Sequence, residues 1–305
     1  MIIGKKQIEK LRIPRYVAQT LQEGGILANS VIRESNILTN GIQKGVSQST
    51  DYADIVENRS ASSEATRIEQ VADDTPLTIA IDGPAGTGKS TIAKALAEHY
   101  GCLYFSAGML YRSLAYACWQ KNIDINNETA VCASVQELTL EYRVQDSDNE
   151  KSLAVYLDNR EITPLLHSEI ISLITPTVAK YPLVREHFRQ IQRSIASTTD
   201  IVMEGRDICT VVLPNAKHKF YLTASAEVRA ERRLAQITCT DGADYVRILE
   251  EIKARDKEDG ERAISPLKCA DDAVLIDNSD MDIGESVQAF CDVIDSRENY
   301  TSLVR

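Results

Sequence analysis

Several features that would direct a protein to a membrane, an oxidising compartment or a metal are missing from this sequence. No apolar run approaches the roughly 20 residues that a bilayer-spanning helix needs, and no apolar signal segment opens the chain. The seven cysteines include no C-x-x-C pair, and the four histidines show no spacing typical of metal ligands. We therefore expect a soluble cytoplasmic protein with reduced cysteines and no membrane partner.

An excess of positive charge is missing as well. The chain carries 34 Lys and Arg against 45 Asp and Glu, a formal net charge of −11. A general nucleic-acid binder releases counterions through a basic face, which this balance does not supply. We therefore expect no nucleic-acid partner, and any basic site must be local. At 305 residues and 43% hydrophobic content, the chain is long enough to bury a sizeable core.

The first part of the chain, residues 1–75, differs in composition from the rest. It holds only two aromatic residues, Tyr16 and Tyr52, and a serine-rich, linker-like stretch near residue 60. Basic residues among the first fifteen would fit a transit peptide or a docking arm, although Glu9 and the lack of serine there weaken that interpretation. We expect a poorly ordered N-terminal extension that catalysis does not require.

A glycine-rich turn is the most informative stretch of the chain. The apolar run Leu77–Ile81 predicts a buried strand, and apolar spacing over Lys89–Tyr100 predicts a helix. Between them, GPAGTGKS (83–90) matches the pattern G-x-x-x-x-G-K-[ST]. Glycines let successive N–H groups converge on a phosphate, and the following helix N-terminus adds partial positive charge. The pattern predicts a nucleoside triphosphate site, with Lys89 at the β/γ-phosphates and Ser90 at a Mg²⁺ ion.

From Pro76 onward strand and helix patterns alternate, which is typical of a parallel sheet wrapped by helices. The predicted strands are Leu77–Ile81, Leu103–Phe105, Asp200–Met203, Lys219–Leu222 and Ala273–Ile276. The predicted helices are Lys89–Tyr100, Met109–Gln120, Leu183–Ser197, Ala226–Ile237, Tyr245–Lys257 and Ile283–Asp295. We expect an α/β domain over residues 76–300, with a doubly wound parallel sheet of the P-loop NTPase type.

One segment interrupts this alternation, at about residues 138–182. Ser152–Leu157 and Arg160–Ile162 flank Asp158-Asn159, which predicts a hairpin, and a helical run follows from Ser168. We expect an inserted lobe that grips a ligand rather than building the core.

Arginines gather late in the chain, where they could meet a second phosphate. They are Arg229, Arg232, Arg233, Arg255 and Arg262. Composition alone fits either an ordinary charged helix surface or a phosphate-binding cluster, and the phosphate loop favours the cluster.

Acidic residues also follow two of the apolar strands. Glu204 and Asp277 could each serve as the carboxylate of a nucleotide-bound metal site, and the sequence leaves both open because strand-end carboxylates are common. Arg206 and Asp207 follow directly after Glu204. At the edge of a parallel sheet, such a pair could hold a phosphate or a polar base.

Six stretches together carry a family resemblance. They are IAIDGPAGTGKST, YRSLAYA, VREHFRQIQR, EGRDICTVVLP, FYLTASAEVRAERR and IKARDKEDGERAISPLKCADDAVLIDNS. In this order and spacing the chain resembles the bacterial cytidylate (CMP) kinases. The resemblance covers Leu77 to Ile294, and residues 1–75 have no counterpart in the usual family member.

This resemblance implies ATP-dependent phosphorylation of CMP or dCMP, with UMP as a poorer acceptor, Mg²⁺ as cofactor, small nucleotides as partners and a monomeric protein. It implies that segment 138–182 binds the nucleoside monophosphate and that a helical lid lies at about 228–262. The implied ATP-binding residues are Gly83, Pro84, Ala85, Gly86, Thr87, Gly88, Lys89, Ser90 and Thr91. The implied acceptor-binding residues are Arg112, Arg185, Arg206, Asp207, Arg255, Asp259 and Arg262. The implied catalytic residues are Lys89, Arg229, Arg233 and Arg255, and Asp207 would accept from the 4-amino group of cytosine.

Several positions depart from the usual family pattern. Ser106-Ala107 replaces Asp-Ser/Thr, and Pro176, His167, Cys209 and Glu258 replace a serine, an arginine, a glycine and a lid residue that is often basic. Because most of these lie around the acceptor, its identity stays open at this point. The alternatives are the same fold with a changed acceptor, such as UMP or another small phosphorylated substrate, and a nucleotide-binding regulator with weak kinase activity.

Overall fold

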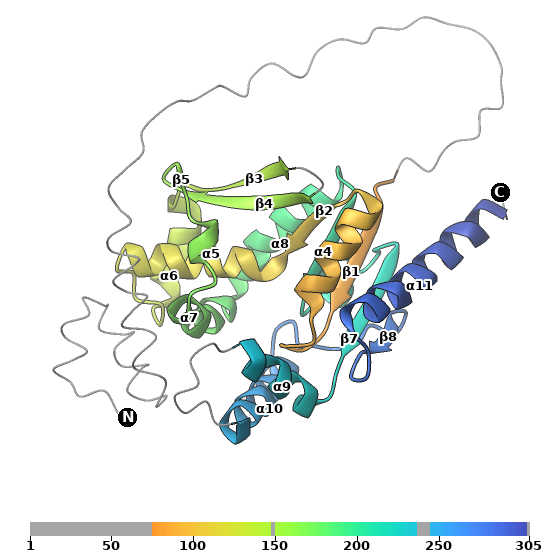
Figure 1. Ribbon diagram of the computed structural model, residues 1–305. Helices are drawn as coiled ribbons and strands as arrows, with labels where there is room; N and C mark the ends of the chain where they lie inside the picture. Colours follow the sequence, from red (N-terminus) through yellow and green to blue (C-terminus); the bar gives the residue numbers. More distant parts are fainter. Residues whose placement is uncertain (1–74, 148–149, 237–244, 304–305) are drawn as a thin grey trace, which may run out of the picture.

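The computed structural model describes residues 75–147, 150–236 and 245–303 (Figure 1). The predicted N-terminal extension therefore lies outside the described residues, apart from its last residue, Thr75, and so does Ile237 at the end of one predicted helix. Within the described ranges, helices cover both faces of a central sheet (Figure 1).

The strands and their order in the sheet define the architecture. They are β1 (Thr78–Asp82), β2 (Leu103–Ser106), β3 (Leu140–Ser147), β4 (Glu150–Leu157), β5 (Arg160–Glu161), β6 (Ile201–Gly205), β7 (His218–Thr223) and β8 (Val274–Asp277). In the described part of the chain they form one eight-stranded sheet in the order β3-β4-β2-β6-β1-β7-β8, with β5 paired to β4. The neighbouring pairs β4-β2, β2-β6, β6-β1, β1-β7 and β7-β8 are parallel. Strands β3 and β5 run antiparallel to β4. The predicted doubly wound, mainly parallel sheet is confirmed.

The helices connect and cover these strands. They are α4 (Lys89–Tyr100), α5 (Ala107–Gln120), α6 (Glu128–Glu137), α7 (Glu169–Ala179), α8 (Pro182–Ala196), α9 (Ala226–Gln236), α10 (Tyr245–Glu261) and α11 (Ile283–Leu303), with short turns η2 (Thr163–Leu165) and η3 (Ile208–Val212). None of these helices combines the length and the apolar character that crossing a bilayer requires.

Side-chain alternation along β1 divides the interior into two cores. Ile79 and Ile81 are fully buried in one core, which α4 and α11 complete with Leu96 and Phe290. Ala80 belongs to the core on the opposite face, beneath α5, α7 and α8. Successive residues of a strand point to opposite faces, so a continuous apolar strand is one that both layers cover. Figure 1 shows α4 and α11 side by side on their face of the sheet.

The position of β1 explains where a ligand site forms. β1 lies between β6 and β7, and the chain passes from β1 to β2 on one side and later to β7 on the other. In open α/β sheets, ligands bind outside the carboxyl ends of the strands at such a reversal. The turn after β1 and the residues after β6 meet at this edge.

Most predicted elements are present, most of them with ends shifted by up to four residues, whereas α11 continues eight residues beyond its predicted end at Asp295. The helix Lys89–Tyr100 is confirmed at both ends, because Gly88 and Gly101 adopt left-handed conformations, with φ of 88° and 68°, on either side of it. Two elements were missed. Helix α6 has a narrow apolar face, and β3 is an edge strand in which the side chain of Val144 is 57% exposed. Neither segment therefore shows a strong periodicity of apolar residues.

The expectation that segment 138–182 does not build the core is wrong. Strand β4 pairs in parallel with β2, with Leu103 opposite Lys151, and thereby extends the main sheet. Leu153 and Val155 are buried in the same core as α5. The segment contributes to the core because its hairpin occupies the otherwise open edge of β2.

Candidate active site

The glycine-rich turn between β1 and α4 forms an open cradle of backbone N–H groups. Gly86 and Gly88 have φ of 80° and 88°, which L-residues with side chains rarely adopt. A Cβ atom at Gly83 would collide with the carbonyl oxygen of Leu222 on β7. The glycines are therefore required by backbone shape and close strand contact. The turn ends at the N-terminus of α4, whose partial positive charge favours an anion.

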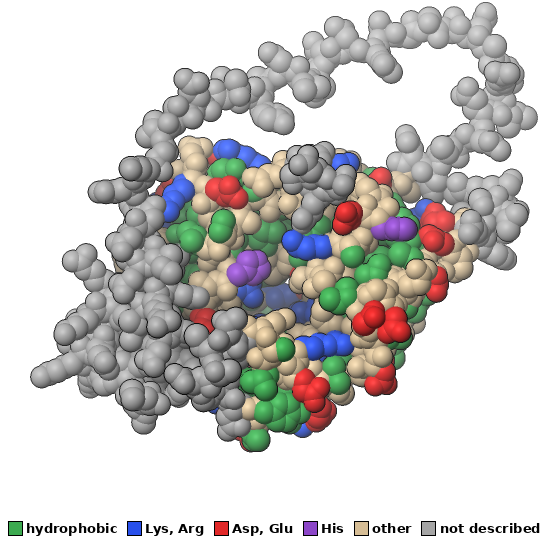
Figure 2. Space-filling view, in the orientation of Figure 1, with side chains coloured by type: hydrophobic (Ala, Val, Ile, Leu, Met, Phe, Trp, Pro, Cys, Tyr) green, Lys and Arg blue, Asp and Glu red, His purple; other side chains and the backbone are tan. Residues whose placement is uncertain are grey.

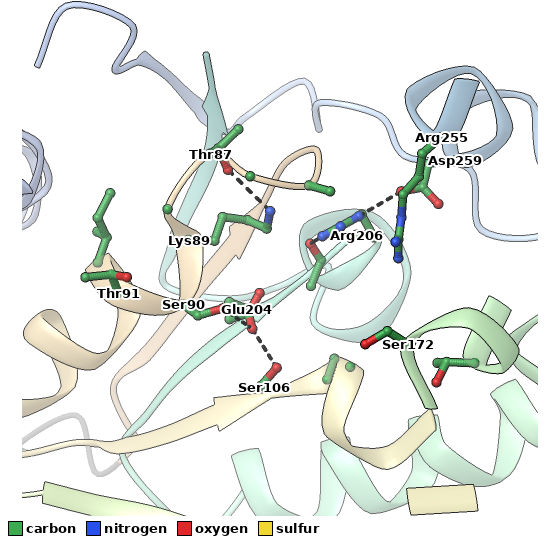
Figure 3. A pocket seen from close by; sticks show the side chains of 18 of the residues that line it. Thr87, Lys89, Ser90, Thr91, Ser106, Ser172, Glu204, Arg206, Arg255 and Asp259 are labelled. Carbon is green, nitrogen blue, oxygen red and sulfur yellow. Dashed lines mark hydrogen bonds and ion pairs between the residues drawn. The ribbon is translucent and has the colours of Figure 1, made fainter. Parts of the chain in front are cut away.

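Lys89 lies folded over this turn. Its Nζ donates to the carbonyl oxygen of Pro84 at 2.6 Å. It also donates to Oγ1 of Thr87 at 3.4 Å (Figure 3). Burial lowers the pKa of Lys89 well below its ordinary value, and nearby Arg206 lowers it further. A phosphate beside the ammonium would reverse this effect, since an opposite charge favours the protonated form.

A buried aspartate at the end of β1 orders the loop after β6. Asp82 accepts hydrogen bonds from the backbone N–H groups of Ile208, at 2.9 Å, and Cys209, at 2.7 Å. Burial raises its pKa to about 6 despite these two bonds. The bonded amides open η3, a single π-helical turn, so Asp82 connects the phosphate loop to the segment that carries Arg206 and Asp207. Sequence reasoning gave Asp82 no role.

Of the two candidate strand-end acids, Glu204 is the one beside the phosphate loop. Its Oε1 accepts from Ser90 Oγ at 3.1 Å and from Ser106 Oγ at 2.6 Å (Figure 3). Asp277 is exposed at the end of β8, where it accepts instead from Ser279. The structure therefore separates two residues that the sequence left equivalent.

The donors near Ser90 fit Mg²⁺. Across the described ranges, no three His, Cys, Asp or Glu side chains form a cluster that could hold a metal ion. Mg²⁺ differs from cage-bound metals because it keeps several waters and binds through one or two carboxylates and substrate phosphates. A serine hydroxyl and one carboxylate beside a phosphate cradle are hard oxygen donors of this kind.

A cleft of about 1350 Å³ extends from this loop across the carboxyl edge of the sheet. Eight Lys or Arg and five Asp or Glu side chains line it, so the cleft is locally basic in a chain of net charge −11. Figure 2 shows basic side chains gathered in the hollow of this face. The expected local concentration of positive charge is present.

All seven residues predicted to bind the acceptor line this cleft: Arg112, Arg185, Arg206, Asp207, Arg255, Asp259 and Arg262. Five of them form acid-base pairs, with Arg185 Nη2 at 2.7 Å from Asp207 Oδ2 and Arg206 Nε at 2.9 Å from Asp259 Oδ2. Arg262 Nη2 lies 3.4 Å from Asp259 Oδ1. Residues from α5, from α8, from the turn directly after β6 and from the end of α10 thus converge, although they are far apart in sequence.

Arg112 lies where several guanidinium groups face one another. Its Nη1 donates to Ser172 Oγ at 2.7 Å and to the Leu166 carbonyl oxygen at 3.1 Å. Partial burial, and after it the neighbouring Arg255, lowers the pKa of Arg112. Arg206 and Arg233 act in the same direction. This mutual repulsion would be relieved by a phosphate anion in the cleft.

Four predicted residues do not line the cleft: Gly83, Pro84, Arg229 and Arg233. Arg229 is only 4% exposed, and its guanidinium donates to both carboxylate oxygens of Asp256, at 3.0 and 2.6 Å. It also donates to the carbonyl oxygens of Ala85 and Ala224, at 3.1 and 3.0 Å. Arg233 is exposed on α9. Arg229 therefore ties the phosphate loop to α10 rather than facing the cleft.

Sequence reasoning also missed the contacts by which Asn278 and Arg232 hold the phosphate loop at Thr87. Asn278 Nδ2 donates to the carbonyl oxygen of Thr87 at 3.0 Å. Arg232 donates to Asn278 through both Nη atoms, at 3.1 and 2.8 Å, and both residues line the cleft. An asparagine after a short edge strand has no distinctive sequence signal, so only the fold reveals its role.

The positions at which the resemblance implies a departure from the usual pattern concentrate at this site. Ser106, Ala107, His167, Pro176 and Glu258 all line the cleft. Cys209 is buried beneath it, with Sγ 3.5 Å from the carbonyl oxygens of Ala80 and Phe220.

Comparison with known proteins gives one consistent family. The family model described as cytidylate kinase matches residues 79–296. The chain is 39% identical over 222 residues to the cytidylate kinase of Bacillus licheniformis, covering 72% of this chain and 97% of that protein. It is 37% identical to the cytidylate kinase of Geobacillus sp. with the same coverage. It is also 37% identical over 227 residues to that of Lactiplantibacillus plantarum, covering 74% and 97%. The matched region extends from β1 into α11.

Proposed function

Because the chain belongs to the cytidylate kinase family, we propose that it transfers the γ-phosphate of ATP to CMP or dCMP, forming CDP or dCDP. The observation that carries this proposal is a single cleft with a phosphate loop at one end and five arginines, Arg112, Arg185, Arg206, Arg255 and Arg262, elsewhere along it. A triphosphate at the loop and a monophosphate among the arginines would share this cleft.

ATP would bind with its phosphates on the backbone N–H groups of Gly83 to Thr91. Lys89 would turn from the Pro84 carbonyl to the β/γ-phosphates, whose negative charge favours its protonated form. Ser90 and Glu204 would hold Mg²⁺, which when bound neutralises phosphate charge. The hydrogen bond between these two side chains supports this role.

The acceptor base would be recognised by Asp207. A carboxylate accepts hydrogen bonds only, so it favours the 4-amino group of cytosine over the 4-carbonyl oxygen of uracil. Arg185 holds one carboxylate oxygen of Asp207 at 2.7 Å, and both side chains are almost fully buried. Burial sharpens the discrimination because an unpaired polar group there is costly.

Transfer would need no strong base. The acceptor phosphate is already anionic, and phosphoryl transfer passes through a loose transition state that depends on alignment and charge stabilisation. Lys89, Arg112 and Arg255 would share the developing charge. Movement of α9 and α10 as a lid, bringing Arg233 toward the cleft, would exclude water.

A changed acceptor is the second candidate, because specific residues of the acceptor end favour it. Ala107 and Pro176 line the cleft without the hydroxyl groups usual at these positions. Each missing hydrogen bond would weaken the usual acceptor by about 1 kcal/mol. UMP or another small phosphorylated substrate would then compete better with CMP.

An ADP-release assay with ATP, Mg²⁺ and a panel of CMP, dCMP, UMP, AMP and GMP tests the proposal. We expect CMP and dCMP to give the highest kcat/KM. Faster turnover of UMP would support the changed acceptor. No stimulation by any cytidine nucleotide would contradict the proposed function.

We further propose that the protein acts as a cytoplasmic monomer whose partners are small nucleotides. The resemblance to the family supports this proposal, and light scattering after size-exclusion chromatography would check the oligomeric state.

A further inference from the structure

Ser106 occupies the N-cap position of α5, yet its hydroxyl does not cap the helix. A serine at this position ordinarily accepts a hydrogen bond from an amide in the first helical turn. Here no side-chain cap bond is formed. The hydroxyl instead donates to Glu204 Oε1 at 2.6 Å (Figure 3). A local helix-stabilising role therefore does not account for the hydroxyl of Ser106.

The sheet register brings these two residues together. Ser106 and Glu204 are direct partners on the parallel strands β2 and β6. Ser90 at the start of α4 donates to the same oxygen, Oε1, at 3.1 Å. Among the described residues, nothing donates a hydrogen bond to Oε2. The carboxylate, which is 6% exposed and lines the cleft, thus has one bonded oxygen and one open oxygen.

We propose that Ser106 is a positioning residue for the Mg²⁺ that accompanies ATP: its hydroxyl holds Oε1 of Glu204 and leaves Oε2 available to the cation or its water. This inference rests on the proposed function, since Ser90 and Glu204 must be the metal's oxygen donors. When Ser90 turns its hydroxyl to the cation, Ser106 is the donor that keeps the carboxylate in place. Residues that orient a metal-binding group in this way contribute strongly to metal affinity.

A hydroxyl suits this position better than a carboxylate would. An aspartate at residue 106 would place a second negative charge against Glu204, and like charges at hydrogen-bond distance disfavour each other. The serine supplies a donor instead.

The test measures metal binding without turnover. Mn²⁺ replaces Mg²⁺ as a paramagnetic probe, and the full-length protein is saturated with a non-hydrolysable ATP analogue and given no acceptor. We expect Ser106→Ala to weaken Mn²⁺ binding to the protein-nucleotide complex about tenfold. Ser106→Thr, which keeps the hydroxyl, should bind Mn²⁺ nearly as the wild type does. Affinity for the nucleotide in excess EDTA should be unchanged.

Two further variants separate this role from general loss of a buried hydroxyl. Ser134→Ala removes a buried hydroxyl that donates to the Val131 carbonyl oxygen at 2.7 Å on α6, outside the cleft, and should leave Mn²⁺ binding unchanged. In a Glu204→Gln background, Ser106→Ala should weaken Mn²⁺ binding further by less than about twofold, because the hydroxyl acts through the carboxylate.

Two results would overturn the inference: unchanged Mn²⁺ binding by Ser106→Ala, or an equal loss in the Glu204→Gln background. Ser106→Cys, which fills a similar volume with a weaker donor, provides the same comparison if the alanine variant does not fold. A wild-type protein that binds no ATP would overturn the proposed function together with this inference, so the two failures are distinguishable.

Discussion

At the scale of single residues, the site contains a buried lysine. Lys89 is 5% exposed and bonded to its own loop. Replacing Lys89 by alanine should reduce turnover about 100-fold or more, the magnitude typical of a lost electrostatic donor. The measurement is kcat for CMP phosphorylation at saturating ATP.

Lys121→Ala is the matched control, because Lys121 pairs with Asp158 in the open and does not line the cleft. Its turnover should equal that of the wild type. Near-normal turnover of Lys89→Ala would refute the assignment of the phosphate loop.

Asp82 makes a pH-dependent contribution to stability. Its pKa is about 6 in the folded protein against an ordinary value of 3.8, with burial as the main cause. Between these values the native state keeps a proton that the unfolded chain has lost. The stabilisation is therefore complete below about pH 4 and is lost as the pH rises through 6, by about 3 kcal/mol at most.

Denaturant unfolding of the wild type and Asp82→Asn at pH 4, 5, 6 and 7 measures this effect. The free energy of unfolding of the wild type relative to the variant should fall with rising pH. Asp277→Asn is the control without a change in this pH range, because hydrogen bonds from Ser279 lower the pKa of Asp277 and its contribution therefore changes only below about pH 4. Its effect should be small, since the side chain is exposed. Parallel curves for the wild type and Asp82→Asn would contradict the prediction.

At the scale of secondary-structure elements, α9 and α10 are joined to each other and to the phosphate loop through Arg229. Its fork-like contact with Asp256 links the two helices, and its bond to the Ala85 carbonyl reaches the loop. Replacing either partner alone, by Arg229→Met or Asp256→Leu, should cost about 2 kcal/mol because it leaves the other charge unpaired. Urea unfolding would measure this.

The double variant distinguishes an anchor from a catalytic cation. With both charges removed, stability should recover in part, and turnover should stay within about tenfold of the wild type. If Arg229 instead contacts the transferred phosphate, as the family resemblance implies, the double variant should lose turnover as severely as Lys89→Ala.

The hairpin of segment 138–182 explains why the expectation that this segment does not build the core is wrong. Its hairpin was predicted from the turn at Asp158 and Asn159, and both residues do have positive φ, 49° and 63°. Which sheet β4 would join could not be predicted, because strand pairing across about fifty residues leaves no local pattern. The pairing of β4 with β2 decided it.

At the scale of the whole molecule, the described elements from β1 to α11 contain the sheet, both cores and the cleft. A variant that starts at Thr75 should therefore keep the kcat and KM of the full-length protein. Its thermal midpoint should lie within about 4 °C of the full-length value, because we expect the free energy of unfolding to change by less than about 1 kcal/mol. Steady-state kinetics and thermal unfolding would measure both.

A variant that ends at Asp282 provides the opposite case. It lacks α11, whose Phe290 and Ile294 are fully buried in the core that also contains side chains of β1 and β7. This variant should fail to fold, since a core face would be exposed to water.

Loss of activity in the variant that starts at Thr75 would contradict the first of these two predictions and would show that residues 1–74 take part in catalysis.

The sequence by itself determined the features that depend on neighbours in the chain. The phosphate loop, the strand before it and the helix after it all follow from spacing within about 25 residues, where glycine conformation and apolar period act locally. The family resemblance then supplied the acceptor residues, and all of them line the cleft.

Only the tertiary structure decided which distant residues meet. In the fold, Glu204 rather than Asp277 contacts Ser90, Arg229 pairs with Asp256, and Asn278 donates to the phosphate loop. These contacts span from 27 to 191 positions of sequence. They depend on strand order and on helices packing over a sheet edge, and no period in the sequence records either one.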